Sequence, residues 1–209
     1  MKTVIINYGS GNLRSVEKGV LFASQSLNME IKVTASSDEV RSADRIILPG
    51  VGSFADCMKG LTAISGMREA LEEVVIERGR PFLGICVGMQ LLADQGLEHV
   101  STKGLGWISG VVDKIAVDKL KVPHMGWNNL EIAQSHTLFN EVSSGDHAYF
   151  VHSYHFKVAN PKNILAHVDY GGYIAAAVVR DNISGTQFHP EKSQAVGLKT
   201  IENFLKWFP

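Results

Sequence analysis

The stretch PFLGICVGMQLL, at residues 81–92, is the main indication of the fold in this sequence. The stretch opens with an apolar run at 82–85, which is typical of a strand buried on both faces of a parallel sheet. It continues without a clear stop into residues 89–92, which favour a helix. Cys86 is therefore predicted at a sharp strand-to-helix turn, with a glycine two residues away on either side.

A cysteine at such a turn has the geometry of a nucleophile elbow, which lifts the side chain above the edge of the sheet. We expect the flanking glycines to leave room for substrate, and the positive end of the following helix to favour a thiolate at Cys86. The backbone N–H of Val87 is predicted to face a developing oxyanion. The alternative is a buried structural cysteine in a tight turn, so the catalytic interpretation needs a general base.

The sequence TQFHPE at residues 186–191 predicts that base. Its first three residues favour the end of a strand, and His189 follows directly. A cysteine nucleophile needs a base, and the base needs an acceptor on its second ring nitrogen. Glu191 is predicted to be that acceptor, on an extended segment stiffened by Pro190. Alone, His-Pro-Glu is most often a surface loop; together with the glycine-flanked cysteine it indicates a catalytic site.

Composition limits the class of protein. With 209 residues, 45% of them hydrophobic and 20% charged, we expect one globular domain spanning residues 1–209. A net charge of −1 and a pI near 6.7 do not favour nucleic acid as a partner. We see no signal-peptide pattern and no apolar stretch near the ~18 residues of a membrane span. Two cysteines, Cys57 and Cys86, do not make a disulfide framework, so a cytoplasmic location is expected.

The first half of the chain alternates predicted strands with predicted helices. Strands are expected near 3–6, 31–33, 46–48 and 82–85, and helices from residue 13, near 55–61 and near 67–76. Asn12 is the expected N-cap of the first helix. This alternation predicts an α/β fold with a parallel sheet, in which functional sites gather beyond the carboxyl ends of the strands.

Two glycine-rich turns lie at those strand ends. Gly50-Val51-Gly52 either exposes a backbone N–H around Val51 as a second oxyanion donor or only allows a tight turn. The turn NYGSGN at 7–12 lacks the third glycine of a dinucleotide loop and the lysine of a P-loop. We therefore predict no nucleotide site there.

The sequence pattern of the second half predicts short antiparallel strands that extend or cover one edge of the sheet. They are expected at 111–117, 127–132, 147–156, 164–168, 173–179 and 183–188, followed by a helix at 196–208 that packs on the first strands. His152 and His155 look like a metal-ligand pair, but positions three apart on one strand face opposite sides. No metal is predicted.

Together these residues resemble the class I, triad-type glutamine amidotransferases. The resemblance rests on GICVGMQ at 84–90 and on His-Pro-Glu at 189–191. The further motifs NYGSGN, LPGVGSF, PHMGWN and YFVHSY are similar to those of the glutaminase subunits of imidazole glycerol phosphate synthases in histidine biosynthesis. The resemblance covers essentially the whole chain.

This resemblance implies a flavodoxin-like α/β domain that hydrolyses L-glutamine to L-glutamate and ammonia without a cofactor. Cys86 would attack the amide, His189 would transfer protons, and Glu191 would orient His189. Other implied roles belong to the oxyanion donors Val87, Val51 and Gly52, and to the substrate-binding positions Gly50, Gln90, Glu98, Ser153 and Tyr154. In relatives the turn at Val51 can be flipped until the partner is engaged.

The resemblance also implies a partner, a (β/α)₈-barrel cyclase subunit in a heterodimer. It would use the ammonia to convert a ribulosyl aminoimidazole carboxamide nucleotide to imidazole glycerol phosphate and the carboxamide ribotide, AICAR. This chain has no clustered Lys/Arg or phosphate loop for such a substrate. Docking residues are expected on the side of the strand ends, namely Asn12, Trp127, Tyr149 and Lys192.

Alternative functions keep the same cysteine and histidine. Amidotransferases of pyridoxal phosphate synthesis or aromatic-amine synthesis would carry other accessory turns than PGVGSF and PHMGWN. A cysteine peptidase or a thiol-dependent deglycase of similar fold would not require a glutamate two residues beyond His189 or a glutamine at position 90. A catalytically inactive binding subunit is the non-enzymatic alternative, and it does not explain an intact set of Cys86, His189 and Glu191.

Overall fold

The computed structural model describes residues 1–9 and 12–209, so the middle of the NYGSGN turn, at 10–11, lies outside the described residues. Eight strands form the main sheet. Their spatial order is β2 (Glu30–Thr34), β1 (Lys2–Ile6), β3 (Arg45–Gly50), β4 (Phe82–Cys86), β14 (Ile183–Thr186), β13 (Tyr173–Arg180), β12 (Ile164–Asp169) and β9 (Glu131–Ile132). The strands from β2 to β14 are parallel, and β13, β12 and β9 continue the sheet in antiparallel fashion. The predicted α/β fold with an antiparallel extension is confirmed.

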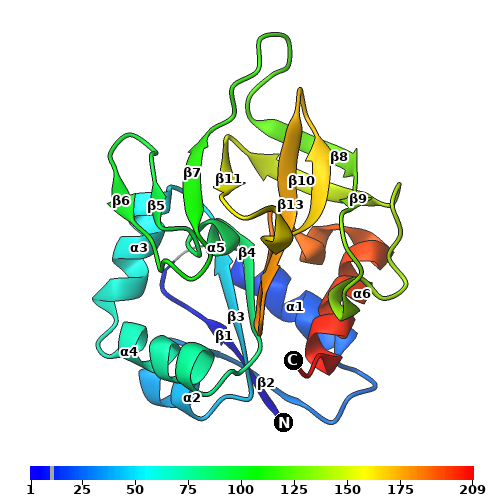
Figure 1. The fold of residues 1–209 in the computed structure, drawn as a ribbon. Helices are drawn as coiled ribbons and strands as arrows, with labels where there is room; N and C mark the ends of the chain where they lie inside the picture. The colour runs from blue at the N-terminus through cyan, green and yellow to red at the C-terminus, as the bar shows by residue number, and fades with distance from the viewer. Residues whose placement is uncertain (10–11) are drawn as a thin grey trace.

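Helices cover both faces of the parallel part. They are α1 (Leu13–Ala23), α2 (Ser37–Arg41), α3 (Phe54–Ala63), α4 (Met67–Leu71), α5 (Val87–Gln90) and α6 (Gln194–Lys206). In Figure 1, α1 and α6 lie on one side of the sheet and α2, α3 and α4 on the other. A π-helical turn, η1 (Glu72–Glu77), continues α4, and the 3₁₀ turns are η2 (Thr137–Phe139), η3 (Pro161–Asn163) and η4 (Pro190–Lys192).

Two small sheets, one antiparallel and one mixed, rise beyond the carboxyl ends of the parallel strands (Figure 1). One pairs β8 (His124–Asn129) with β10 (His147–His152), and the other contains β11 (Tyr154–Val158), β7 (Gly110–Lys114), β5 (Gln95–Gly96) and β6 (Thr102–Lys103). They therefore cover the carboxyl ends of the parallel strands, where ligand-binding sites lie in parallel α/β folds.

Burial explains why the central strands carry almost no polar side chains. Every residue of β3 and β4 is buried, as expected for parallel strands with helices on both faces. Helix α1 is amphipathic and buries the stripe formed by Val16, Gly19 and Val20. Buried side chains from both halves of the chain join one hydrophobic cluster. The extension consequently packs with the parallel strands instead of forming a separate core.

Several predicted elements differ from the structure. The strand expected at 147–156 is two strands in different sheets, because the chain bends at Ser153. The helix expected at 67–76 is α-helical for one turn and then widens into η1. The last helix ends at Lys206, two residues before the predicted end, and packs beside α1. Asn12 is the N-cap residue of α1, as predicted, but its backbone is left-handed and its side chain makes no capping hydrogen bond with the described residues.

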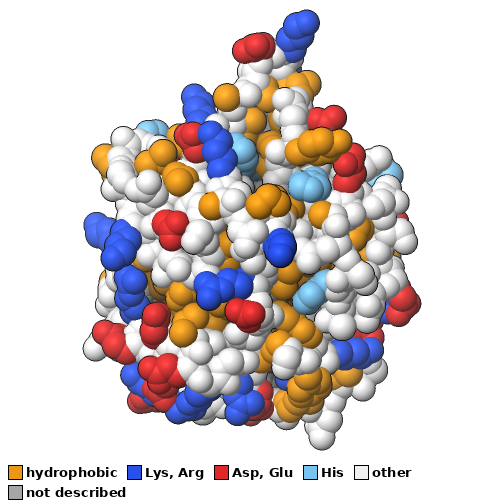
Figure 2. Space-filling model, viewed as in Figure 1, with side chains coloured by type: hydrophobic (Ala, Val, Ile, Leu, Met, Phe, Trp, Pro, Cys, Tyr) orange, Lys and Arg blue, Asp and Glu red, His pale blue; other side chains and the backbone are white. Residues whose placement is uncertain are grey.

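Charged side chains of both signs lie on the face of the molecule drawn in Figure 2. On the face drawn in Figure 2, acidic and basic side chains are interspersed, in keeping with the formal net charge of −1. Within the described residues, no helix combines the length and the apolar character needed to cross a bilayer.

Candidate active site

The turn between β4 and α5 holds Cys86 in an uncommon backbone conformation. Its φ is 55° and its ψ is −112°, a region that non-glycine residues rarely occupy. Such strain persists where the surrounding packing enforces it, and it is concentrated at functional sites. The predicted elbow therefore has a direct backbone signature. Helix α5 has only four residues, so the helix dipole expected to act on Cys86 is short.

The two glycines beside Cys86 serve packing, which corrects the prediction that they leave room for substrate. A Cβ on Gly88 would lie 1.8 Å from the carbonyl oxygen of Leu48 in β3. A Cβ on Gly84 would lie 2.4 Å from the carbonyl oxygen of Gly88. Neither glycine lines the cavity at Cys86. The glycines let the elbow fold tightly on itself and against β3.

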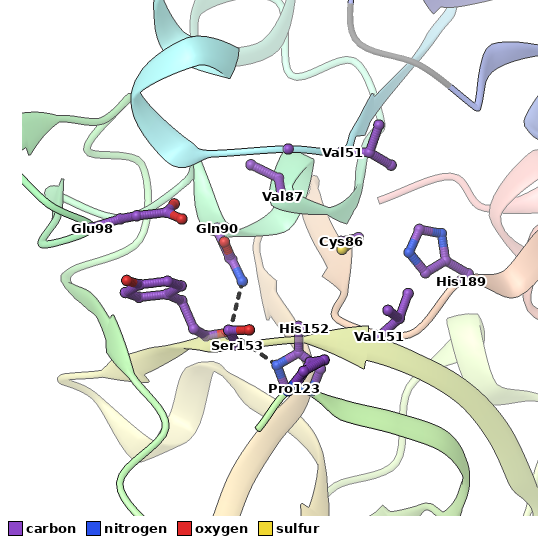
Figure 3. Close-up of a pocket in the computed structure, with 12 residues that line it drawn as sticks. Val51, Cys86, Val87, Gln90, Glu98, Pro123, Val151, His152, Ser153 and His189 are labelled. Atoms are coloured by element: carbon purple, nitrogen blue, oxygen red, sulfur yellow. Dashed lines mark hydrogen bonds between the residues drawn. The ribbon is translucent and has the colours of Figure 1, made fainter. Parts of the chain in front are cut away.

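A cavity of about 330 Å³ opens beside Cys86, within the usual size range of small-molecule sites. In Figure 3, Cys86 lies between His189 on one side and Gln90 on the other, with Glu98 farther along. The lining residues are Val51, Gly52, Cys86, Val87, Gln90, Glu98, Pro123, Val151, His152, Ser153, Tyr154 and His189. Of the predicted substrate-binding and oxyanion positions, only Gly50 is missing from this lining.

His189 lies between Cys86 and Glu191. Its Nδ1 is 2.8 Å from Glu191 Oε1, which leaves the other ring nitrogen for its hydrogen bond with Cys86. Burial by itself lowers the pKa of His189, but the hydrogen bonds and charges of Cys86 and Glu191 outweigh it and raise the pKa to about 9. The imidazole thus holds a proton at neutral pH and can serve as an acid as well as a base.

Strand β14 brings His189 to the cysteine. This strand pairs in parallel with β4, so both strands end at the same edge of the sheet. The N–H of His189 then donates to the carbonyl oxygen of Tyr149 in β10, at 3.0 Å. The segment that follows is the 3₁₀ turn η4 and not the predicted extended segment. The turn still directs the Glu191 carboxylate back to the imidazole.

Glu191 is held in a closely packed setting. Its side chain is fully buried, and a Cβ on Gly19 of α1 would lie 3.1 Å from the Glu191 Cβ. Oε1 accepts hydrogen bonds from both His189 Nδ1 and the Asn12 side-chain amide. Oε2 is buried and has no hydrogen-bond partner among residues 1–9 and 12–209. Both donors therefore converge on a single carboxylate oxygen.

The glycine-rich turn after β3 has two parts. Gly50 belongs to β3, and a Cβ there would lie 2.5 Å from the backbone nitrogen of Gly88. In the structure Gly50 packs closely against the elbow and does not line the cavity, and its contact with the substrate stays a prediction. Val51 and Gly52 do line the cavity. The Val51 carbonyl accepts a hydrogen bond from the thiol of Cys57 at 3.4 Å, so the N–H of the same peptide, from Gly52, points away from Cys57.

Four predicted substrate-binding positions surround the far end of the cavity. Gln90 Nε2 donates to the backbone carbonyl of Tyr154 at 2.9 Å, and Figure 3 shows the Gln90 oxygen turned away from that bond. Glu98 Oε2 accepts the N–H of Phe54 at the start of α3, at 2.8 Å. Ser153 and Tyr154 lie at the bend between β10 and β11. An amide oxygen, a carboxylate and a polar bend thus lie within reach of one bound molecule.

Residues that the sequence analysis did not single out also contribute. Gln187 is fully buried, and its Nε2 lies 3.7 Å from Cys86 Sγ. His152 lines the cavity and contacts His124, with 3.0 Å between ring nitrogens. Burial is the main cause that lowers the pKa of His152 to about 3 and of His124 to about 4, so both are neutral. The position of Gln187 directly before Phe-His-Pro-Glu was the only available signal for it.

The histidine pair that was weighed as a metal site is divided between two sheets. His152 ends β10, whereas His155 lies in β11, so the predicted failure to converge has a different cause. Residues 1–9 and 12–209 contain no group of three or more His, Cys, Asp or Glu side chains arranged to hold a metal ion.

The four residues predicted to dock a partner form a connected group. The Asn12 amide binds Glu191, and Lys192 Nζ lies 5.8 Å from the centroid of the Tyr149 ring. That ring meets the Trp127 indole edge-on, with centroids 5.9 Å apart, and Trp127 is 48% exposed. These residues thus run outward from the site to the surface, and their docking role stays a prediction.

Comparison with known proteins places this geometry in a family. Residues 4–207 match the family model of the class I glutamine amidotransferases. The chain belongs to that family. The class I amidotransferase fold is also shared by two solved structures, each titled as a glutamine amidotransferase. One has a TM-score of 0.72 at 20% identity and covers 97% of both chains. The other, from Thermotoga maritima, has a TM-score of 0.65 at 16% identity and covers 99% of this chain and 81% of its own.

Within the class I amidotransferases, curated relatives identify the subfamily. The chain is 55% identical to the imidazole glycerol phosphate synthase subunit HisH of Mesorhizobium japonicum, with 100% of both chains covered. It is also 55% identical to the same subunit of Rhodospirillum rubrum, again over 100% of both. The chain therefore belongs to the HisH subfamily, as the accessory motifs predicted.

Proposed function

We propose that this chain is the glutaminase subunit of an imidazole glycerol phosphate synthase and hydrolyses L-glutamine through a thioester on Cys86. One observation carries the mechanism. The strained Cys86, the protonated His189 and the buried Glu191 lie in line beside a cavity of about 330 Å³. An amide is a poor electrophile and an amine anion a poor leaving group, so the reaction needs a nucleophile and a proton donor together.

In the first half of the reaction, the sulfur of Cys86 attacks the side-chain amide carbon of glutamine. The tetrahedral intermediate collapses, the carbon–nitrogen bond breaks, and the proton held by His189 goes to the nitrogen, so that ammonia leaves. In the second half, the neutral imidazole takes a proton from water, which attacks the thioester. Glutamate and the Cys86 thiolate are released, and His189 is protonated again. Glu191 keeps the Nδ1 proton in place throughout.

Both tetrahedral intermediates carry an oxyanion. We assign its donors to the backbone N–H of Val87 and to the turn of Val51 and Gly52, which lie beside Cys86 in the cavity wall. Loss of one such donor typically lowers kcat roughly 10²- to 10³-fold. A change in the peptide conformation of this turn would therefore switch the activity, which suits an enzyme that would otherwise waste glutamine.

The substrate is assigned an orientation in the same cavity. Glu98 offers a carboxylate to the α-ammonium group, Gln90 offers its amide oxygen, and the bend at Ser153 and Tyr154 holds the α-carboxylate end. Charge-assisted hydrogen bonds of this kind are the stronger ones in a site shielded from water. The reaction amide is then directed to Cys86.

The ammonia is used by a cyclase subunit. We propose that this partner is a (β/α)₈ barrel that forms a heterodimer with the chain and docks where Asn12, Trp127, Tyr149 and Lys192 emerge. Ammonia would pass through a protected route, since it is protonated in bulk water. We expect the complex in the cytoplasm, where histidine is made.

The test measures the release of glutamate from glutamine in three samples. These are the chain alone, the chain with its cyclase subunit and a nucleotide ligand, and the same complex made with Cys86→Ala. Slow release alone, a strong rise in the complex and loss in Cys86→Ala are expected. Fast release by the chain alone would remove the gating by the Val51 turn. Absence of glutamate under every condition would refute the catalytic assignment and leave a binding subunit.

A further inference from the structure

Gln187 occupies a position that the mechanism above does not use. It follows directly on Thr186, the last residue of β14, and has no solvent exposure. Its side chain points across the sheet edge to Cys86, with Nε2 3.7 Å from Sγ. A fully buried amide needs hydrogen-bond partners, and the sulfur is one of the two that the described residues give this side chain.

The neighbours determine which end of the Gln187 amide faces the sulfur. The backbone oxygen of Tyr154 can only accept, so the group of Gln90 that lies 2.9 Å from it is the NH₂ donor. The same NH₂ lies 2.9 Å from Gln187, which must present its oxygen there. The remaining end of Gln187, its own NH₂, is therefore directed at Cys86. The orientation follows from the hydrogen-bond network, as amide assignments require.

We propose that Gln187 is a further catalytic residue, whose side-chain N–H stabilises the sulfur of Cys86 as a thiolate before attack and again as the leaving group of the thioester. Sulfur accepts weakly as a thiol, but a hydrogen bond to an ionised acceptor is roughly twice as strong as one between neutral groups. The inference rests on the proposed glutaminase reaction and adds a residue to it.

This donor complements His189 in one respect. His189 gives its proton away when ammonia leaves, so its attraction for a negative sulfur changes during the cycle. An amide N–H does not titrate, so the Gln187 donor is constant through every step. Burial also keeps water from competing for the sulfur from this side, and low polarity strengthens the interaction.

The competing explanation is that Gln187 only fills the core and satisfies Gln90. Two variants separate the explanations. Gln187→Met keeps the size and removes the donor. Gln187→Glu keeps an oxygen for the Gln90 amide and places a second oxygen at the sulfur in place of the donor. Thr186→Val is the matched control, because Thr186 is equally buried and its hydroxyl donates to the carbonyl of Phe188, at 3.0 Å, instead of to the sulfur.

The experiment measures alkylation of Cys86 by iodoacetamide between pH 5 and pH 10 in the full-length chain without glutamine. Peptide mass spectrometry separates Cys86 from Cys57, and thermal unfolding monitors the fold of each variant. For Gln187→Met we expect a profile displaced to higher pH and a rate at neutral pH about ten-fold lower, the effect of one hydrogen bond to a charged group. For Gln187→Glu we expect a larger displacement. Thr186→Val should keep the wild-type profile even if it lowers the melting temperature.

An unchanged profile in both Gln187 variants would overturn the proposal, and so would an equal displacement in Thr186→Val. If Gln187→Met fails to fold, Gln187→Glu decides, because it retains the contact with Gln90. The readout needs no glutamine turnover. A chain that proves inactive towards glutamine but shows the displaced profile would therefore refute the proposed function and leave the role of Gln187 at the thiol intact.

Discussion

The two donors on one oxygen of Glu191 lead to a specific prediction for Glu191→Gln. His189 Nδ1 and the Asn12 amide both donate to Oε1, while Oε2 is buried and has no partner in the part of the chain that the structure describes. In glutamine only the oxygen accepts hydrogen bonds. The donors therefore hold the new amide oxygen at the Oε1 position, and its NH₂ takes the Oε2 position. The substitution removes the charge but keeps the imidazole tautomer.

The magnitude follows from that geometry. A hydrogen bond to a charged group contributes about 1.5–3 kcal/mol and a neutral one about 0.5–1.5 kcal/mol. The difference of about 1–2 kcal/mol corresponds to a roughly 5- to 30-fold loss of kcat. When replacement of a triad carboxylate by its amide leaves the histidine in the wrong tautomer, kcat falls about 10⁴-fold. The two outcomes differ by more than a hundred-fold and are easily distinguished.

The assay is steady-state glutamate release with saturating cyclase subunit for Glu191→Gln, Asn12→Ala and the double variant. Without the Asn12 donor, the amide of Glu191→Gln is free to rotate and to direct its NH₂ at His189. The double variant should therefore lose far more activity than the product of the single losses. A loss near 10⁴-fold in Glu191→Gln alone, or simple multiplication in the double variant, would refute the reasoning.

Three further predictions follow from the site. The pKa of His189 rises from 6.5 in the unfolded chain to about 9 in the folded protein, so its protonation contributes roughly 3 kcal/mol of stability below pH 6.5. This contribution is lost as the pH rises through about 9. Urea unfolding at pH 6.5 and pH 9.5 should show the loss in the wild type but not in His189→Gln. Gly88→Ala should destabilise the chain by more than about 3 kcal/mol, because its Cβ would lie 1.8 Å from the Leu48 oxygen; a thermal shift of only a degree or two would contradict this. Glu98→Gln should raise KM for glutamine roughly ten-fold or more with little change in kcat, and an effect on kcat alone would argue against a contact with the substrate ammonium.

The reactive groups could be located from the sequence because local chemistry marks them. A cysteine between a buried apolar strand and a helix-favouring stretch has few backbone options, and the structure gives Cys86 a positive φ. His-Pro-Glu stands at a strand end, and the parallel pairing of β14 with β4 then brings it to the cysteine. Residues 183–188 were expected among the antiparallel strands of the second half, so this parallel pairing in the middle of the sheet was not predicted.

Other features depend on tertiary contacts that leave no local signal. Glycine-rich turns indicate close approach but not which group approaches, so Gly84 and Gly88 were expected to leave room for substrate, whereas they pack against the protein backbone. The bend at Ser153 interrupts an apolar alternation that continues on both sides. Gln187 gains its partners Cys86 and Gln90 only when the segment after β14 meets the turn between β4 and α5.

The place of β14 between β4 and β13 has a consequence for the newly made chain. Cys86 leaves the ribosome about a hundred residues ahead of the strand that carries its base. At synthesis rates of roughly 5–20 residues per second, it waits on the order of 5–20 seconds without that base. The central position next to β4 also stays vacant for this time, and long-range strand insertion is slow. The nascent polypeptide is therefore inert towards glutamine until its last sheet strand has been inserted.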